Sequence, residues 1–541
     1  MKRNNRYKIT LLITMLALFL SACTQNAAPN TSQNSSGSAG AEGTKTQAGD
    51  DKSPITLTWF VDQQWYSHEW DTQNVLFDKL VTEQTGITIN FVSGNAEKLS
   101  ALIASGDIPD IVTVDKAIPQ RKLLERSGLV LPLDELIAKH DPTFELPQSI
   151  QDWYRNEDGH FYGLPNYFKA PEKMQEGDFI PTHVTLRARQ DIMDQLGIKE
   201  EAFNTKEGTL EALRKVRDAN IEYNGFKVIP SYFDSYQLIQ MFGAKREDAQ
   251  GNYVDTTREP QALEAYKFLN QLYREGLMPQ DSQTLNKNQI EEKVNAGAVF
   301  AYTNWVIKWA GLFSNDSNAT FAPVGPIKGD SDQPFYLDPS AVSGWTLTMV
   351  GKSTKHPERI VKLLKYLSED EMSLNAWWGP RSEAWEYDGN GKVKFTEQRN
   401  QDFAKDFNAA KKKYSGPEWL VTWTPIQRTY PEPQTTHEQL ENATEAKFSQ
   451  YSYYSLPFEG VAVDGGTAEA GIETKINDYR TQMRAAMILA KSEVEVEKLF
   501  NEMIAQEEKL GYTRLYEVYN SKFQEAKKKL GIEFAWPTNI K

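Results

Sequence analysis

A single cysteine, Cys23, is the sequence feature that most limits how this 541-residue chain can fold. A disulfide needs two cysteines, so no intrachain crosslink can hold a small, loop-rich fold together. The rest of the chain is too long for one small core, and its length favours two or more large lobes. The folded part must therefore be stabilised by packing alone.

The first 22 residues have the pattern of an export signal. A basic start is followed by 12 mostly apolar residues at 9–20, fewer than the ~20 that a membrane-spanning helix needs. The sequence LSAC at residues 20–23 resembles a bacterial lipobox, in which the cysteine is lipidated and becomes the first residue of the mature protein. The alternative is an incidental free cysteine, which its place directly after the apolar stretch disfavours. We predict a signal peptide over residues 1–22 and a palmitate-type lipid anchor on Cys23.

Residues 24–53 are rich in Ser, Asn, Gly, Ala, Gln and Thr and contain no aromatic residue. Such a chain buries too little apolar surface to offset the entropy that is lost on ordering. We predict that residues 23–53 form a lipidated, flexible linker and that the folded part begins near Pro54. The folded part is then expected on the extracytoplasmic face of the cell membrane.

The acidic balance of the chain limits its partners. The formal net charge is −14, and removal of residues 1–22, which hold four basic residues and no acidic one, makes it −18. Nucleic acid and anionic membrane faces repel such a surface. We therefore expect no nucleic acid as a partner, and contact with the membrane only through the lipid anchor.

Beyond residue 54, the apolar periodicity alternates between strands and helices. This order predicts an α/β fold with mostly parallel sheets and helices on both faces. Ligands bind such open sheets at the carboxyl ends of the strands, here residues 61–65, 93–95 and 114–117. The expected strands are residues 55–61, 87–92 and 111–114, and the expected helices are residues 74–84 and 97–104.

Several short motifs follow one another in a fixed order. In ASGDIPDIV at residues 104–112, Gly106 ends a helix and Pro109 prevents its extension into the buried strand that follows. In their order the motifs resemble the extracellular solute-binding proteins of ABC importers, family 1, and the long tail resembles the lipoprotein subgroup that captures complex oligosaccharides. The further motifs are EDGHFYGLP at 157–165, LRAR at 186–189, YREGL at 273–277, VNAGAV at 294–299, SGW at 343–345 and HPE at 356–358.

The resemblance implies a two-lobed, periplasmic-binding-protein-like fold of type II. Each lobe is then a mixed, mostly parallel sheet flanked by helices, and crossover segments between the lobes act as hinges. Lobe 1 is expected from residues 54–165 and 336–376, and lobe 2 from residues 166–335 and 377–541, with a C-terminal helical extension.

Three segments combine Gly or Pro with aromatic residues and are candidates for these crossovers: residues 164–167, 337–342 and 377–382. Closure of two lobes on a ligand by hinge bending is a known switching mode of binding proteins. The alternative for each segment is an ordinary surface loop.

The 13 tryptophans indicate the class of ligand. An indole face stacks against the apolar C–H face of a pyranose, while carboxylates, amides and guanidinium groups bind the hydroxyls. We expect Trp59, Trp309, Trp385 and Trp536 to belong to the core instead, where most tryptophans lie. The expected ligand-binding residues are Asp62, Gln64, Trp65, Trp70, Asn166, Tyr302, Asn304, Trp305, Trp345, Trp378, Arg381 and Glu383.

Catalytic and metal-binding motifs are incomplete in the sequence. The six histidines are scattered, and His437 with Glu438 lacks the second histidine of a zinc helix. The sequence DGNG at residues 388–391 begins like a calcium loop but lacks the later ligands, so a hairpin turn is expected. We expect no catalytic residue, no metal site and no cofactor. A structural calcium ion stays open, because some relatives in the family carry one.

Two functions from different classes fit these features. The first is a lipid-anchored, monomeric receptor that captures an oligosaccharide between two lobes and delivers it unchanged to the two permease subunits of an ABC importer. The second is a surface lipoprotein that acts as a glycoside hydrolase or polysaccharide lyase, and a binder of peptides or phosphate esters is a weaker third. The ordered motifs favour the receptor, since a barrel hydrolase needs eight repeated strand–helix units. We therefore predict a binding protein that is not an enzyme.

Overall fold

The computed structural model describes residues 51–175, 178–304, 306–331, 334–340, 342–417, 419–420, 429–464 and 467–536. The predicted signal peptide, Cys23, the linker up to residue 50 and Trp305 lie outside the described residues. Arg359 forms an ion pair with Asp51 (3.2 Å) and donates a hydrogen bond to the backbone carbonyl of Ser53 (3.0 Å). The predicted linker therefore extends too far, because residues 51–53 are already held against the folded body.

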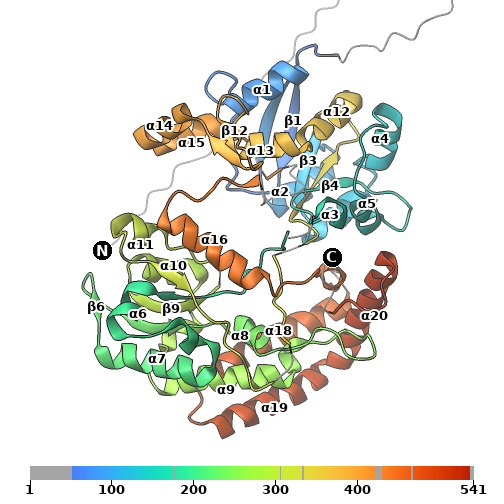
Figure 1. Ribbon diagram of the computed structural model, residues 1–541. Helices are drawn as coiled ribbons and strands as arrows, with labels where there is room; N and C mark the ends of the chain where they lie inside the picture. Colours follow the sequence, from blue (N-terminus) through green and yellow to red (C-terminus); the bar gives the residue numbers. More distant parts are fainter. Residues whose placement is uncertain are drawn as a thin grey trace, which may run out of the picture. The chain divides into compact units, whose positions relative to one another are not determined.

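A five-stranded mixed sheet forms the centre of the first lobe (Figure 1). Its order is β2-β1-β3-β11-β4, with β1 (Ile55–Val61), β2 (Ile87–Ser93), β3 (Ile111–Asp115), β4 (Gly163–Pro165) and β11 (Thr346–Val350). β1 runs parallel to β2 and β3, whereas β11 runs antiparallel to β3 and β4. The three strands predicted from the sequence are confirmed.

Helices flank this sheet, and both helices predicted between its strands are present. α2 begins after Asn95, whose side chain accepts a hydrogen bond from the backbone N–H of Lys98 (3.1 Å), and it ends at Gly106 with a φ of 78°, as the motif predicted. The fully buried Trp59 and Leu57 lie in the core beside the sheet. The helices are α1 (Leu76–Thr85), α2 (Ala96–Ser105), α3 (Pro119–Arg126), α4 (Leu133–His140), α5 (Gln148–Tyr154) and α12 (Pro357–Leu367).

A four-stranded sheet forms the centre of the second lobe, in the order β10-β5-β9-β8. β8 and β9 are parallel, whereas β5 is antiparallel to both of its neighbours. The sheet is mixed, as predicted, but it is not mostly parallel, because β5 enters it in the opposite direction. The elements are β5 (Leu186–Arg189), β8 (Ile229–Tyr232), β9 (Val299–Thr303), β10 (Phe321–Pro323), α6 (Gln190–Leu196), α7 (Lys206–Ala219), α8 (Ser235–Met241), α9 (Pro260–Arg274), α10 (Lys287–Asn295), α11 (Ala310–Asn315) and α16 (Thr436–Ser449).

The segment after residue 376 stays with the first lobe, contrary to the predicted boundary. Trp385 and Tyr414 are fully buried in a cluster with Leu374 that also contacts Leu76 of α1, and Leu420 lies in the same core as Trp59. This cluster holds the described residues between 377 and 420 on the first lobe, so the predicted crossover at 377–382 is wrong. The elements are α13 (Asp370–Trp378), the predicted hairpin of β12 (Trp385–Tyr387) and β13 (Val393–Phe395), α14 (Glu397–Lys405) and α15 (Phe407–Tyr414).

The other two predicted crossovers run side by side. They connect β4 to β5 and β10 to β11, and antiparallel bridges join Phe168 to Ser343 and Thr182 to Pro339. Glu459 fixes the second of them, since its carboxylate accepts the backbone N–H of Ser343 (3.0 Å) and pairs with Lys116 at the end of β3 (2.9 Å). The positions of these two crossovers therefore agree with the sequence prediction.

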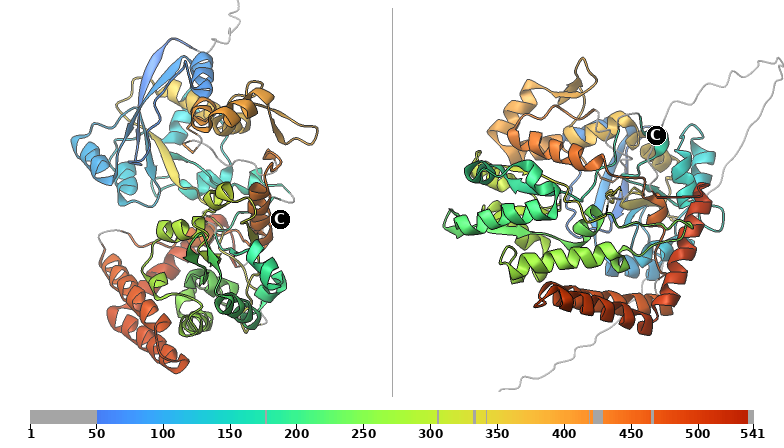
Figure 2. Two further views of the ribbon diagram at one scale, coloured as in Figure 1. Left: turned by 90° about the vertical axis from the view of Figure 1, so that its left-hand side faces the viewer. Right: turned by 60° about the horizontal axis from the view of Figure 1, so that its bottom comes forward.

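The C-terminal helices contact both lobes. Met487 and Phe500, from α18 and α19, lie in the second-lobe core, and Figure 2 shows these helices in red beside that lobe. From α20, Lys529 donates to the backbone carbonyls of Trp153 and Arg155 at the end of α5. The helices are α17 (Leu456–Glu459), α18 (Ala468–Ile488), α19 (Glu493–Leu510) and α20 (Tyr512–Leu530). None of the helices in the described residues is both apolar and extended enough to cross a membrane.

Candidate functional site

Three tryptophans meet at the carboxyl edge of the first sheet. Trp65 follows β1, Trp345 directly precedes β11, and Trp419 follows α15. The rings of Trp65 and Trp345 are nearly parallel, with centroids 6.2 Å apart and an interplanar angle of 8°, and the ring of Trp419 lies 4.9 Å from that of Trp345. We call these three residues the tryptophan platform. Because Trp65 is 62% exposed, the platform presents an indole surface to solvent.

Hydrogen bonds fix two of the three rings. Trp345 donates from Nε1 to the carboxylate of Asp115 at the end of β3 (2.9 Å), and Trp65 donates from Nε1 to Gln63 (3.0 Å). Gln64, a predicted ligand residue next to Trp65, is exposed. The residues that follow the first-lobe strands therefore converge, as their place at the strand ends predicted.

Asp62 adds a buried carboxyl group to this edge. It follows β1, is 7% exposed, and its backbone N–H donates to the carbonyl of Thr113 (2.9 Å). Burial, with a contribution from the nearby charges of Asp115 and Glu97, raises its pKa to about 6. The protonation of Asp62 therefore changes near pH 6 rather than near pH 4.

Asn166 is fully buried, so it offers no surface to a ligand. Its side chain instead bonds to the backbones of Trp345 and Trp419. The prediction that Asn166 contacts a ligand is therefore wrong, and its side chain supports the platform instead.

A cavity of about 210 Å³ lies at the carboxyl ends of β8 and β9 in the second lobe. Asn304, a predicted ligand residue, lines it together with Asp234 and Arg484. Asn304 has a φ of 89°, and its side-chain oxygen accepts a hydrogen bond from the backbone N–H of Val306 (3.0 Å). Residues in such rarely populated backbone conformations are concentrated at functional sites.

The charges in this cavity are incompletely matched. Desolvation raises the pKa of Asp234, although its side chain is exposed, as expected for a carboxyl group in a concave site. Arg484 lowers that pKa by its charge, yet within the described residues its guanidinium group forms no hydrogen bond or ion pair. The cavity therefore has polar groups that a hydroxyl-rich ligand could bind.

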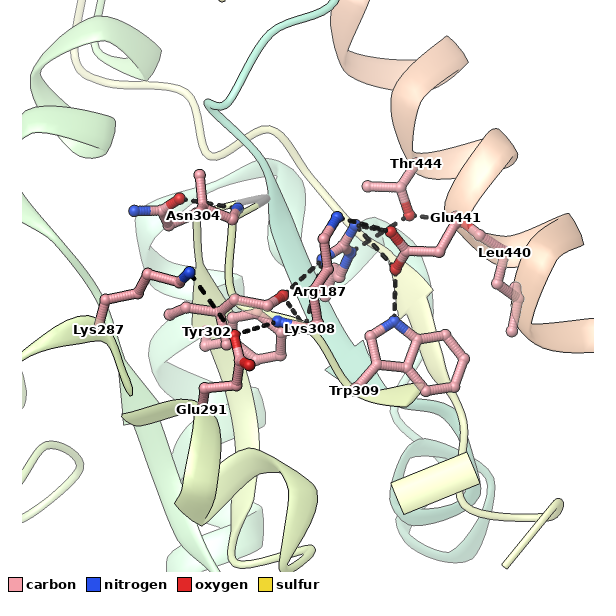
Figure 3. Close-up of polar contacts among 12 residues, drawn as sticks. Arg187, Lys287, Glu291, Tyr302, Asn304, Lys308, Trp309, Leu440, Glu441 and Thr444 are labelled. Atoms are coloured by element: carbon pink, nitrogen blue, oxygen red, sulfur yellow. Dashed lines mark hydrogen bonds and ion pairs between the residues drawn. The ribbon is translucent and has the colours of Figure 1, made fainter. Parts of the chain in front are cut away.

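Tyr302 lies beneath this region rather than on its surface (Figure 3). It is fully buried, and its hydroxyl accepts a hydrogen bond from Arg187 (3.3 Å), so the prediction that it contacts a ligand is wrong. Arg187 pairs with Glu441 of α16 (3.1 Å), which also accepts the ring N–H of Trp309 (2.6 Å). Trp309 is fully buried, as predicted for the core, and this network fixes α16 to the second lobe.

The remaining predicted residues lie away from the platform. Trp70 donates to Thr82 of α1 (3.0 Å) and packs on the first-lobe core. Trp378 stands edge-on to Tyr430, with ring centroids 5.4 Å apart. Of the described residues predicted near them, Arg381 pairs with Glu371 and Glu386 at 3.0 Å each, and Glu383 is exposed. The structure does not bring these side chains into direct ring contact with Trp65, Trp345 or Trp419.

Sequence reasoning missed Trp419. Trp345 directly follows Ser343-Gly344, whereas Trp419 stands three residues after Ser415-Gly416, so no local sequence signal marks it. Its place beside Trp345 depends on how residues 377–420 fold back on the first lobe.

Potential metal ligands do not cluster in the part of the chain that the structure describes. There, no group of three or more His, Cys, Asp or Glu side chains is arranged to hold a metal ion. The described residues therefore offer no candidate site for a structural calcium ion.

Sequence comparison identifies related proteins. Residues 70–373, more than half of the chain, match the family described as bacterial extracellular solute-binding protein. The fructooligosaccharide ABC transporter substrate-binding protein FusA of Streptococcus pneumoniae serotype 4 is 26% identical over 259 residues, which cover 43% of this chain and 47% of FusA. The chain thus spans about half the length of this curated relative.

Solved structures of similar proteins align with most of the chain. S. pneumoniae FusA in complex with kestose has a TM-score of 0.64 at 17% identity, over 88% of this chain and 100% of that one. An HMO-binding, ABC-transporter-associated solute-binding protein from Bifidobacterium longum infantis has a TM-score of 0.64 at 15% identity, over 88% and 99%. The alginate-binding protein AlgQ2, solved without calcium ion, has a TM-score of 0.62 at 17% identity, over the same shares. These matches confirm the predicted two-lobed, type II periplasmic-binding-protein-like fold.

Proposed function

Because the chain belongs to the bacterial extracellular solute-binding protein family, we propose that it is the receptor of an ABC importer for an oligosaccharide. It captures the sugar between its lobes and releases it unchanged to a permease of two subunits. The names of the relatives support this proposal, since FusA is described as a fructooligosaccharide ABC transporter substrate-binding protein.

The tryptophan platform is the observation that carries the proposal. Trp65 is stacked on Trp345 and is still 62% exposed, so part of the indole surface stays accessible to a ligand. Stacking of a pyranose face on an indole face removes apolar area from water, while the ring edges leave the hydroxyls free for polar groups. Asp62 and Asp115 provide carboxylates at the same edge. An aromatic surface bordered by acceptors matches a neutral sugar better than a peptide or a phosphate ester.

The second lobe supports the same ligand class with polar rather than aromatic groups. Asp234, Asn304 and Arg484 line its cavity, and amide, carboxylate and guanidinium groups are the usual partners of sugar hydroxyls. We propose that these residues contact the sugar from the other side when the lobes close on it, bending at the two crossovers of residues 164–167 and 337–342. Trp305, next to Asn304, stays in the proposed ligand set.

Binding and cleavage are distinguished by one experiment. The mature protein is titrated by calorimetry with fructooligosaccharides, an N-glycan fragment and alginate oligomers, and the recovered sugar is analysed by chromatography. We expect binding of at least one sugar, with the sugar recovered at its original length. Shortened products would instead identify a glycoside hydrolase or lyase, and absence of binding by all sugars would contradict the receptor proposal.

We also propose that Cys23 carries the lipid that anchors a monomeric protein to the extracytoplasmic face of the membrane. Mass spectrometry of the protein extracted from membranes should find an acylated N-terminal Cys23. Cys23→Ser should release the protein into the medium with its sugar affinity unchanged, since the folded part begins near residue 51. Retention of the Ser variant on the membrane would contradict the lipid anchor.

A further inference from the structure

One buried side chain joins the first two crossovers between the lobes and the segment at Trp419. Asn166 lies directly after β4, at the start of the first crossover, and is fully buried. Its Oδ1 accepts the backbone N–H groups of Trp345 (3.0 Å) and Thr346 (2.7 Å), at the end of the second crossover. Its Nδ2 donates to the backbone carbonyl of Trp419. Segments far apart in the sequence are thus bonded to a single amide.

The backbone around Asn166 is as closely fitted as its side chain. Its N–H donates to the carbonyl of Thr346 (3.1 Å). Gly344 has a φ of 87°, and a Cβ added there would lie 2.1 Å from the Asn166 carbonyl oxygen, so this position requires glycine. The next residue, Tyr167, has a φ of 50°, which is uncommon for a residue other than glycine. The first two crossovers are therefore held in contact at this point despite local backbone strain.

Only an amide satisfies this set of partners. An asparagine side chain can accept and donate at the same time, whereas an aspartate can only accept and a leucine can do neither. Each backbone N–H or carbonyl left without its partner in the buried interior is destabilising. Asparagine is therefore required by the three backbone partners and not by contact with solvent or ligand.

The bonds of Asn166 reach two of the three platform residues. Trp345 is held by its backbone N–H to Asn166 and by its ring N–H to Asp115. The backbone carbonyl of Trp419 accepts a hydrogen bond from Asn166. Within the described residues, no hydrogen bond donated by its ring N–H is found. Packing against Trp345 and Trp65 then completes its orientation.

We propose that Asn166 is a positioning residue that assembles the tryptophan platform. It fixes the separation of Trp345 and Trp419, and through contacts with their rings the position of Trp65, at the place where the first two crossovers meet. The platform then keeps its geometry while the lobes move about the crossovers. The assembly of the rings is independent of the ligand, and its effect on sugar affinity rests on the proposed function.

The test compares two buried asparagines. Asn166→Asp keeps the size and the acceptor but, at a pH where the carboxyl group is ionised, removes the donor to the Trp419 carbonyl. We expect it to reduce the near-ultraviolet circular dichroism of the coupled indoles, measured without ligand, and to weaken sugar binding about tenfold, the effect of one lost buried hydrogen bond. The control is Asn270→Asp in the second lobe, since Asn270 is also fully buried and its amide donates to the carbonyls of Ile488 (3.1 Å) and Ala490 (2.6 Å). It should lose stability but keep the dichroism and the affinity.

The outcomes separate this inference from the proposed function. A folded Asn166→Asp variant with wild-type dichroism overturns the positioning role, whatever the ligand proves to be. Reduced dichroism supports that role even if the wild-type protein binds no sugar, a result that contradicts only the proposed function. Hydrogen exchange on the wild-type protein gives a measurement without any variant: the amides of Trp345 and Thr346 should exchange as slowly as the centre of β11, and rapid exchange overturns the inference.

Discussion

The two lobes carry contrasting candidate surfaces at the ends of their strands. On the first lobe, Trp65, Trp345 and Trp419 form an aromatic surface whose supports are buried hydrogen bonds to Asp115 and Asn166. On the second lobe, the cavity is lined by polar and apolar side chains, and among the described residues the guanidinium group of Arg484 forms no hydrogen bond or ion pair. Packing within one lobe is enough to stabilise an aromatic surface. Unpaired polar groups are stabilised instead when a ligand supplies the hydrogen bonds that they lack.

The contrast suggests a division of roles. Aromatic stacking supplies affinity that depends little on the identity of the sugar, because every pyranose has an apolar face. Hydrogen bonds in a confined polar cavity discriminate more strongly, since a ligand that lacks the matching group leaves buried partners unsatisfied. We therefore expect the first lobe to contribute mainly affinity and the second lobe mainly selectivity.

The largest expected effect is the pH dependence of Asp62. Its pKa is about 6 in the folded protein and 3.8 in the unfolded reference, so the native state binds more protons between these values. The free energy of unfolding should then fall as the pH rises from 4 to 7, by up to about 3 kcal/mol. Asp62→Asn cannot ionise, so it should gain stability relative to the wild type over this range, measured by urea unfolding at several pH values.

Asp234 is the matched comparison in the second lobe. Its pKa is also raised by desolvation, but the charge of Arg484 opposes the shift and its side chain is exposed. Asp234→Asn should therefore change the pH dependence in the same direction. A flat difference between wild type and Asp62→Asn from pH 4 to 7 would contradict the assigned pKa.

The next effect is the loss of stacking at the platform. Trp65→Ala should weaken sugar binding by about 2 kcal/mol, roughly 30-fold, as expected for a central aromatic contact. The melting temperature should change little, because the ring is 62% exposed. Phe407→Ala is the control, since Phe407 is equally exposed on the same lobe. Equal losses of affinity in both variants would show that the platform does not contact the sugar.

A smaller effect is expected from the second-lobe cavity. Arg484→Gln removes a cation that has no partner within the described residues, so the melting temperature should stay unchanged. Affinity for the preferred sugar should fall by about 1–2 kcal/mol, and the ratio between preferred and poor sugars should shrink. Arg217→Gln on α7 is the control, since Arg217 pairs with Asp218 on the surface. Unchanged selectivity in Arg484→Gln would contradict the division of roles.

The smallest effect concerns the contact between the C-terminal extension and the first lobe. Lys529 donates to the carbonyls of Trp153 and Arg155 at the end of α5, a favourable place for a cation. Lys529→Met should lower the free energy of unfolding by about 0.5–1 kcal/mol. The neighbouring Lys528→Met, at an exposed position, should have no effect in thermal denaturation. Equal stabilities of the two variants would show that α20 gains nothing from this contact.

The sequence predicted much of the first lobe because local patterns decide its early elements. β1 at residues 55–61 and the helix end at Gly106 follow from alternating apolar residues and from a glycine that adopts a positive φ. Trp59, Trp309 and Trp385 are fully buried, as predicted for tryptophans of the core. These features depend on neighbours within a few residues, so they can be predicted directly from the sequence.

The boundary at residue 377 and the role of Tyr302 were predicted wrongly for the same reason. The first depends on Tyr414 and Trp385 packing against Leu374 and Leu76, and the second on a core that closes over the ring. All five residues of β9 are buried, so the strand is covered on both faces and the side chain of Tyr302 lies in the interior.

By itself, the sequence determined the class of fold, the order of its strands and helices, and a chemistry rich in indole and carboxylate groups. Only the tertiary structure decided which tryptophans meet and that Trp419 joins them. It also decided that Asn166 is a support rather than a ligand contact. The physical reason is that ring stacking and buried hydrogen bonds act over a few ångströms in space, between residues that are far apart in the chain. Asn166 and Trp419, for example, are separated by 253 positions.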